Sequence, residues 1–182
     1  MKGSVHLKRA LGALLPIAAL AFSQPASAQT STVPTETLII PRLSLVNDGG
    51  LDFGDIVAGP TVSTVTVSPS NVVTSTGSAT PLGNGTTPAL FHGYGAYNQI
   101  VALWLSANQI NLVRSGGGQT MLVNNFTVGS TPPTTLSTNP RNFRIGSLSG
   151  YFSFTVGATL RVGANQVPGS YNGSFAVNIE YY

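Results

Sequence analysis

The stretch that most constrains the fold lies at the C-terminus, where apolar and polar residues alternate in two runs, 151–162 and 171–182. A period of two is typical of a β-strand with one buried face. Gly157 interrupts the first run, and a glycine inside a strand pattern predicts a bulge. The apolar side of the second run consists of Tyr171, Phe175, Val177, Ile179 and Tyr181. Since the sequence stops on this run, we expect it to be either an outer edge or a strand whose next neighbour comes from another molecule.

The first 28 residues have the pattern of a secretory signal peptide. Lys2, Lys8 and Arg9 precede an apolar core at 10–22, and the small-residue triplet 26–28 matches a cleavage site. The apolar run is too short to span a bilayer. We therefore expect a chain that is exported through the periplasm to the cell surface or into an extracellular filament, without membrane insertion.

Charge and cysteine content limit which partners and which kinds of stabilisation the chain can have. Three of the eight basic residues lie in the signal peptide, so the rest of the chain carries five basic and five acidic residues and is formally neutral. Neutrality argues against a nucleic-acid partner, whereas weakly charged surfaces promote association. The sequence has no cysteine, so packing and strand pairing alone must hold the exported domain together.

Short strands joined by turns fill the remainder of the chain, and no segment beyond the signal peptide has helical periodicity. The expected strands are 37–46, 51–57, 61–68, 89–95, 99–106, 110–115 and 120–128, before the C-terminal pair. Residues 47–50 are expected to form a turn, 75–88 a long loop or an irregular hairpin, and 129–139 a loop. This pattern predicts an all-β chain with a single β-sandwich domain at 37–182, preceded by a flexible tail or donor segment at 29–36.

Residues 37–46 allow two interpretations. They are either the first strand of the domain itself or a segment that is donated to a neighbouring molecule. Pro41 lacks a ladder donor and favours an edge or a switch between sheets. The apolar residues available to a donated strand are Val33, Leu38, Ile39, Ile40, Leu43 and Leu45.

Three motifs carry a resemblance to known families. LDFGDIVAG at 51–59, VTVSP at 65–69 and TLRVGANQVPGSYNGSFAVNIEYY at 159–182 resemble the bacterial secreted family catalogued as domain of unknown function 4402. More distantly, the Pro-Gly turn before an alternating terminal strand is similar to chaperone–usher fimbrial subunits and to spore coat U-type proteins.

The fimbrial resemblance implies an immunoglobulin-like sandwich that lacks its last strand. A periplasmic chaperone would cap the edge formed by Tyr171, Phe175, Val177, Ile179 and Tyr181, an outer-membrane usher would export the subunit, and another copy of the chain would then supply a strand, giving a homopolymer. The alternative is a self-contained, secreted or surface-attached binding domain with an adhesin-like role.

Residues for catalysis are scarce. His92 is the only histidine after the signal peptide, and it has no nucleophile motif near it. Asp48, Asp52 and Asp55 lack a calcium-loop pattern. Gly116–Gly118 has no helix or lysine after it, so it predicts a turn rather than a phosphate loop. We expect no enzymatic activity and no cofactor or metal. Trp104 with Tyr94 and Tyr97 could form a sugar-stacking platform, although a lone tryptophan in an apolar run is more often a core residue.

Overall fold

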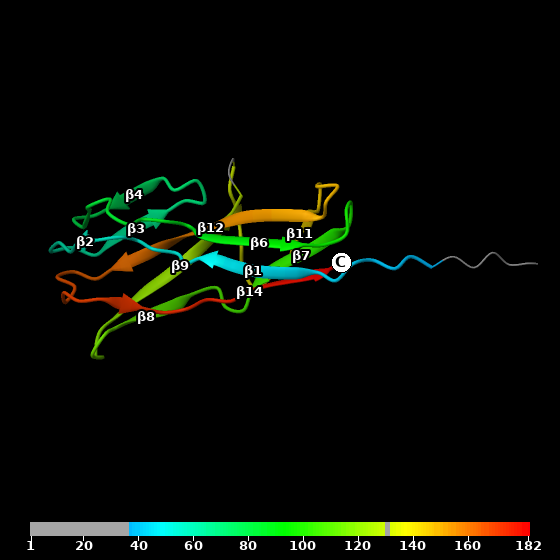
Figure 1. Cartoon of the computed structure of the whole chain (residues 1–182). Coiled ribbons are helices and arrows are strands. Elements are labelled where there is room, and N and C mark those ends of the chain that lie inside the picture. The colour runs from blue at the N-terminus through cyan, green and yellow to red at the C-terminus, as the bar shows by residue number, and fades with distance from the viewer. Residues whose placement is uncertain (1–36, 130–131) are drawn as a thin grey trace, which may run out of the picture. The chain divides into compact units, whose positions relative to one another are not determined.

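The structure, a computed structural model, describes residues 37–129 and 132–182, and these residues contain strands and no helix (Figure 1). The strands are β1 Ser44–Gly49, β2 Ile56–Val57, β3 Ser63–Val67, β4 Val73–Thr76, β5 Thr80–Pro81, β6 Ala89–Tyr94, β7 Ile100–Leu105, β8 Ile110–Arg114, β9 Thr120–Val128, β10 Thr134–Thr135, β11 Arg141–Arg144, β12 Tyr151–Val162, β13 Tyr171–Asn172 and β14 Val177–Tyr181. The prediction of an all-β chain is confirmed. No helix in these ranges has the length and apolar content needed to cross a membrane.

The strands between Leu38 and Tyr182 form two main antiparallel layers and a small two-stranded sheet, β2-β5. The larger layer has the order β1-β6-β12-β9-β8-β13, with β3 and β4 attached beside β12 and β10 beside β9. The smaller layer has the order β11-β7-β14. Both layers contribute to one buried cluster, which includes Val65, Val123, Phe126, Val156 and Leu160 from the larger layer and Leu103 and Leu105 from β7. The predicted β-sandwich is therefore confirmed.

The long strand β12 organises the larger layer. Its first half pairs with β6, and its second half pairs with β3 on one side and β9 on the other. The ladder with β9 is irregular between Gly157 and Thr159, as the glycine predicted, but the extra residue lies on β9, where Asn125 has a φ of 51°. Gly157 has a different role, because a Cβ there would collide with the backbone at Val67 and Ser68. Close approach of β3 thus explains this glycine.

The N-terminal expectations need correction. The first strand begins only at Ser44, so residues 37–43 are not part of a strand, and the predicted turn at 47–50 is wrong. Asn47 lies in β1 and its side-chain amide donates hydrogen bonds to the carbonyls of Gly49 and Leu90. The bond to Leu90 joins β1 to β6 across an irregular step in the ladder, and the bond to Gly49 lies within β1. Asparagine side chains often stabilise turns, but the Asn47 side chain here stabilises strand pairing instead.

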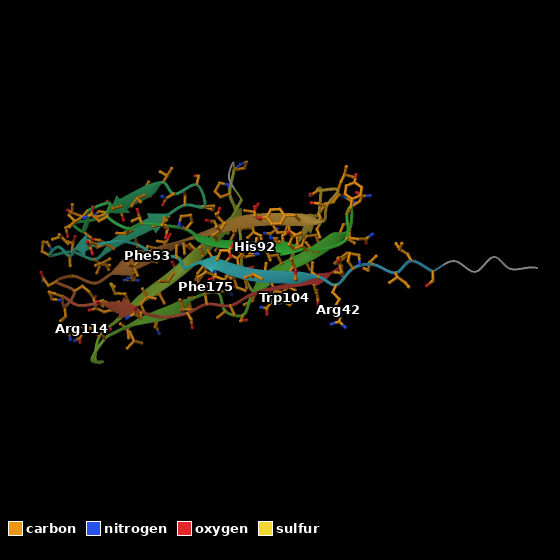
Figure 2. The ribbon with its side chains drawn as sticks, viewed as in Figure 1. Arg42, Phe53, His92, Trp104, Arg114 and Phe175 are labelled. Carbon is orange, nitrogen blue, oxygen red and sulfur yellow. The ribbon has the colours of Figure 1, made fainter. Side chains whose placement is uncertain are left out.

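The alternation at 171–182 predicted one strand, and this prediction is wrong. Tyr171 and Asn172 form β13, which pairs with β8 in the larger layer, whereas β14 pairs with β7 in the smaller layer. Phe175 lies between them, and its ring packs against Phe91 and Phe126 at centroid distances of 6.4 and 5.0 Å (Figure 2). The chain therefore crosses from one layer to the other at a half-buried aromatic residue that contacts the core.

The middle of the chain follows the prediction more closely. Strand β7 is central in its layer and apolar on both faces, and β8 and β9 form the expected hairpin around Gly116–Gly118. The strand expected at 51–57 shrinks to β2 and one isolated bridge. The expected loops at 75–88 and 129–139 contain the short strands β5 and β10. Two-residue strands carry too few residues to produce a visible alternation.

Candidate functional site

Strand β14 is an open edge of the smaller layer. The amide of Ser106 donates to the carbonyl of Ala176 at 3.1 Å, and the amide of Tyr182 donates to the carbonyl of Ile100 at 3.0 Å. In an antiparallel ladder alternate residues point their backbone groups to opposite sides. The amides and carbonyls of Val177, Ile179 and Tyr181 therefore point away from β7, and no described strand pairs with them there.

The side chains of this edge leave the core partly open. Phe175, Val177 and Ile179 pack against the buried cluster but are themselves only half-buried. By contrast, Val65, Val67, Val156 and Ala158, in the half of the sandwich around β3, are completely buried. Burial is thus complete at one end of the domain and incomplete along β14. Of the five residues expected along this edge, Phe175, Val177, Ile179 and Tyr181 lie in or next to β14. Tyr171 belongs to the larger layer instead, and its hydroxyl donates a hydrogen bond to the Val167 carbonyl at 2.6 Å.

An apolar cavity of about 220 Å³ lies between the layers. Phe152 and Phe154 of β12, Val101 and Leu103 of β7, and Phe143 of β11 line it, and Ile179 is its one lining residue from β14. The cavity is partly open to solvent, and Arg144 also lines it. The cavity therefore marks a second region where apolar side chains of both layers lack neighbours.

The apolar residues proposed for donation fall into two groups. Leu45 packs against the domain's own core, and the Leu43 side chain approaches Gly95. Leu38 and Ile39 are 78% and 89% exposed, and Ile40 is also exposed. Val33 lies outside the described residues, as do the expected signal peptide and the tail at 29–36. The structure thus assigns residues 43–49 to the domain, while the segment 38–40 adds little to its core.

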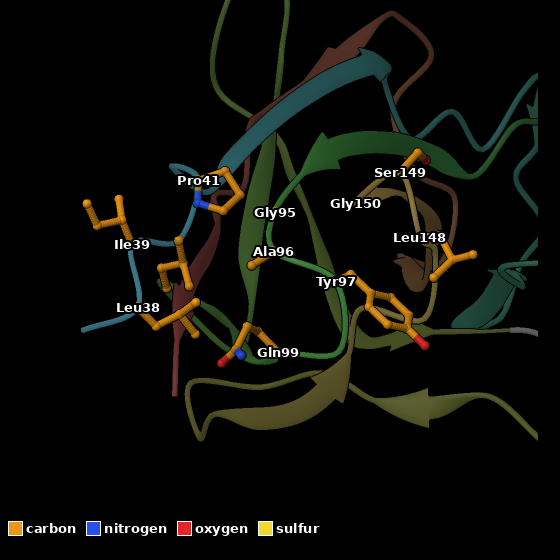
Figure 3. A pocket seen from close by; sticks show the side chains of 11 residues that line it. Leu38, Ile39, Pro41, Gly95, Ala96, Tyr97, Gln99, Leu148, Ser149 and Gly150 are labelled. Carbon is orange, nitrogen blue, oxygen red and sulfur yellow. The ribbon is translucent and has the colours of Figure 1, made fainter. Parts of the chain in front are cut away.

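Tyr181 joins this N-terminal segment to β14. Its hydroxyl accepts a hydrogen bond from the Ala96 amide at 2.7 Å and donates one to the Pro41 carbonyl at 2.9 Å. A surface hollow of about 280 Å³ lies beside the contact, with Leu38 and Ile39 on one side and Tyr97 and Leu148 on the other (Figure 3). The hollow is shallow and holds no charged side chain, so it offers little to a catalytic reaction.

The residues considered for chemistry do not form a catalytic arrangement. His92 lies on β6 and its Nδ1 contacts the Asp48 carboxylate of β1. Asp52 instead accepts a hydrogen bond from the Gly54 amide at 2.8 Å. Within 37–129 and 132–182 no three potential metal ligands come together. The three glycines 116–118 all have positive φ and occupy the β8–β9 turn.

Trp104 and Tyr94 lie on opposite outer faces of the sandwich, so the sugar-stacking platform considered for Trp104, Tyr94 and Tyr97, the less favoured alternative to a core position for Trp104, does not form. Trp104 pairs with Asn178 in the smaller layer, and Tyr94 belongs to β6 in the larger one. Tyr94 instead contacts Tyr151 of β12, at a ring-centroid distance of 5.4 Å. Alternation along β12 placed Tyr151 on the outer face, but sequence alone could not pair it with Tyr94.

The family model described as Domain of unknown function (DUF4402) matches residues 43–181. The chain belongs to this family. The match begins one residue before β1 and ends on the last residue of β14, so it covers the sandwich and leaves out the exposed segment 38–40. A search of curated proteins finds no match. The more distant similarity to fimbrial subunits and spore coat proteins stays a prediction.

Proposed function

We propose that this DUF4402 chain is an exported, non-catalytic subunit of a cell-surface fibre, assembled by β-strand complementation. In this proposal the sandwich is immunoglobulin-like and lacks its last strand, and the N-terminal segment of one copy pairs along β14 of another. The observation that supports it best is the open β14 edge above a half-buried apolar face. Unpaired strand edges are ready templates for pairing with another chain.

The exposed segment 38–40 supplies a suitable donor. Leu38 and Ile39 gain almost nothing from their own domain, since they are 78% and 89% exposed. Full burial of one such side chain contributes about 1.5–3 kcal/mol. Three backbone amides and three carbonyls on β14 would also gain partners, each hydrogen bond adding a net of about 0.5–1.5 kcal/mol. Together these terms are comparable to the stability of a small domain, about 5–15 kcal/mol.

An open edge has to be protected before assembly. We propose that a periplasmic chaperone covers the β14 edge during transit and that an outer-membrane usher releases the subunit into the fibre. The absence of cysteine supports this dependence on partners, because no disulfide replaces the missing contacts in the exported chain. The partner in the final fibre is a second copy of the same chain.

The second candidate is a self-contained, surface-attached binding domain. Its support is the closed half of the sandwich, where Val65, Val67, Val156 and Ala158 are completely buried. A core of this kind can hold a domain together although β14 remains unpaired. The two candidates differ in what the exposed N-terminal residues do, and this difference can be measured.

The test is a double substitution, Leu38→Ser with Ile39→Ser. In a strand these neighbours point to opposite faces, so one of them is lost from the groove whichever face inserts. Loss of one buried side chain weakens each joint by about 1.5–3 kcal/mol, a factor of about 10–150. Stability of the isolated domain should change by less than about 0.5 kcal/mol, because both side chains are exposed.

The matched control is Val72→Ser with Leu82→Ser, which removes two side chains that are 56% and 53% exposed and do not line the hollow beside residues 38–40. Polymers are separated by electrophoresis in detergent without heating and by size-exclusion chromatography. We expect ladders from the parent and the control, and shortened ladders from the N-terminal double variant. A parent that remains monomeric, or equal ladders from all three proteins, would refute strand donation and favour the second candidate.

A further inference from the structure

The outer face of the larger layer carries an aromatic cluster that the proposed fibre contact does not use. Strands β1, β6 and β12 are neighbours there, and their ladders place Ser44, Tyr94 and Tyr151 in one row. His92 and Ser153 face each other in the next row. Val46 of β1 lies opposite His92 and is 48% exposed. We call the outward side chains of Ser44, Val46, Asp48, His92, Tyr94, Tyr151 and Ser153 the tyrosine face. Figure 2 labels His92 on β6 within it.

The two tyrosines are held in an arrangement that burial does not explain. Tyr94 and Tyr151 are 53% and 42% exposed, and their rings meet edge to face, at an interplanar angle of 64°. Neither phenolic hydroxyl makes a hydrogen bond within the described ranges, whereas the hydroxyls of Tyr171 and Tyr181 each bond a backbone carbonyl. The exposed pair therefore presents both an apolar ring surface and free polar groups to solvent.

Polar groups surround these rings at short range. The His92 ring stacks near Tyr151, with centroids 6.2 Å apart and an interplanar angle of 26°. Its Nδ1 contacts Asp48, which fixes the ring and leaves Nε2 without a hydrogen-bond partner among the described residues. The Ser153 hydroxyl lies on the neighbouring strand and is exposed. The face thus combines donors, acceptors and rigid rings on a sheet that positions them.

The tyrosine face carries few ionisable side chains. Asp48 is its one acidic residue and His92, its contact partner, is the one group that can carry a positive charge. Phosphate, sulfate and carboxylate ligands are normally bound by arginine or lysine, and the face has neither. A neutral ligand with both an apolar side and hydroxyl groups matches this composition.

We propose that the tyrosine face binds a neutral oligosaccharide. The C–H face of a pyranose ring would pack on Tyr94 or Tyr151, and the other ring, which meets the first edge to face at a centroid distance of 5.4 Å, would border the same sugar. The sugar hydroxyls would bond the Asp48 carboxylate, His92 Nε2 and the Ser153 hydroxyl. Tyrosine provides large contact area at low conformational cost. The proposal does not depend on how the subunits assemble.

The test is isothermal titration calorimetry of the purified full chain. The neutral probes are cellohexaose, xylohexaose and mannohexaose, and the charged probe of the same length is hexagalacturonate. We expect at least one neutral probe to bind and the charged probe to bind more weakly. Tyr151→Ala should weaken binding by at least about tenfold, as truncation of a central aromatic typically does. Tyr97→Ala, which removes an exposed tyrosine that lines the hollow beside Leu38 and Ile39, should leave the affinity unchanged.

Ser153→Arg provides a second variant that keeps both rings and obstructs the space beside them. Thermal unfolding checks that each variant is folded. If Tyr151→Ala unfolds, Ser153→Arg alone decides, and it too should weaken binding at least about tenfold. Failure of all neutral probes to bind, equal binding of the charged probe, or unchanged affinity in a folded face variant overturns the proposal.

Discussion

Removing the hydroxyl of Tyr181 isolates one contact between β14 and the segment that precedes β1. In Tyr181→Phe the Ala96 amide loses the acceptor that lies 2.7 Å away. Ala96 is 8% exposed, so water cannot easily replace that acceptor. A buried amide without a partner costs about 1–3 kcal/mol. The Pro41 carbonyl adds little, because Pro41 is exposed and water can hydrate it.

Urea unfolding followed by Trp104 fluorescence measures this loss. We expect the free energy of unfolding to fall by about 1–3 kcal/mol with an unchanged m-value, and the melting temperature to fall by about 2–4 °C per kcal/mol. Tyr94→Phe is the matched control, since its hydroxyl has no partner in the described ranges, and its change should stay within about 0.5 kcal/mol. Superimposable curves for the two variants would refute the role assigned to Tyr181.

Two further substitutions probe the larger layer. Gly93→Ala should lower stability by about 1–3 kcal/mol, because its Cβ would collide with the Ser44 carbonyl and lie 2.6 Å from Phe152 Cζ; a melting temperature equal to the parent's would contradict this close approach of β1 and β6. Ser63→Ala should cost about 1–3 kcal/mol, because the buried hydroxyl accepts from the Ser78 and Ala79 amides at 2.9 Å, and a calorimetric enthalpy and midpoint both unchanged would show that these amides have other partners.

Alternation predicted the long strands well, because a sandwich imposes one buried and one solvated face on each of them. In β12 the half-buried Phe152 and Phe154 alternate with the exposed Tyr151 and Ser153, and this difference is already visible in the sequence. The apolar character of β7 on both faces likewise predicted its central place in a layer. Period and hydrophobicity therefore identified the strands that make up most of the core.

Pairing partners could not be predicted in the same way. The run 171–182 keeps its phase through the crossing at Phe175, yet its two ends belong to different layers. A side-chain period reports which face is buried and says nothing about the neighbouring strand. For the same reason the edge role of β14 could be expected, but not the separation of Tyr171 from Val177.

The sequence revealed the tyrosine face only in part, because this face depends on contacts between residues that are far apart in the chain. Asp48 belongs to a sequence typical of turns, and only its contact with His92 places it on a sheet face. Tyr151 gained significance from Tyr94, which is far away in the chain and opposite it in the ladder. The division of 37–46 into an exposed segment and a strand also depends on tertiary packing, which overrides local propensity.

The contrast in burial along β12 has a consequence for recognition. The residues from Ala158 onward are held between β3 and β9, whereas Phe152 and Phe154 are half-buried beside the cavity. One continuous strand thus links the half-buried part of the domain to the fully buried part, so the packing of the buried part fixes the positions of Phe152 and Phe154. An incoming chain would meet a surface that is largely ordered in advance, so association would lose less conformational entropy than the joining of two flexible segments. The domain can therefore bind a partner chain while its own backbone stays ordered.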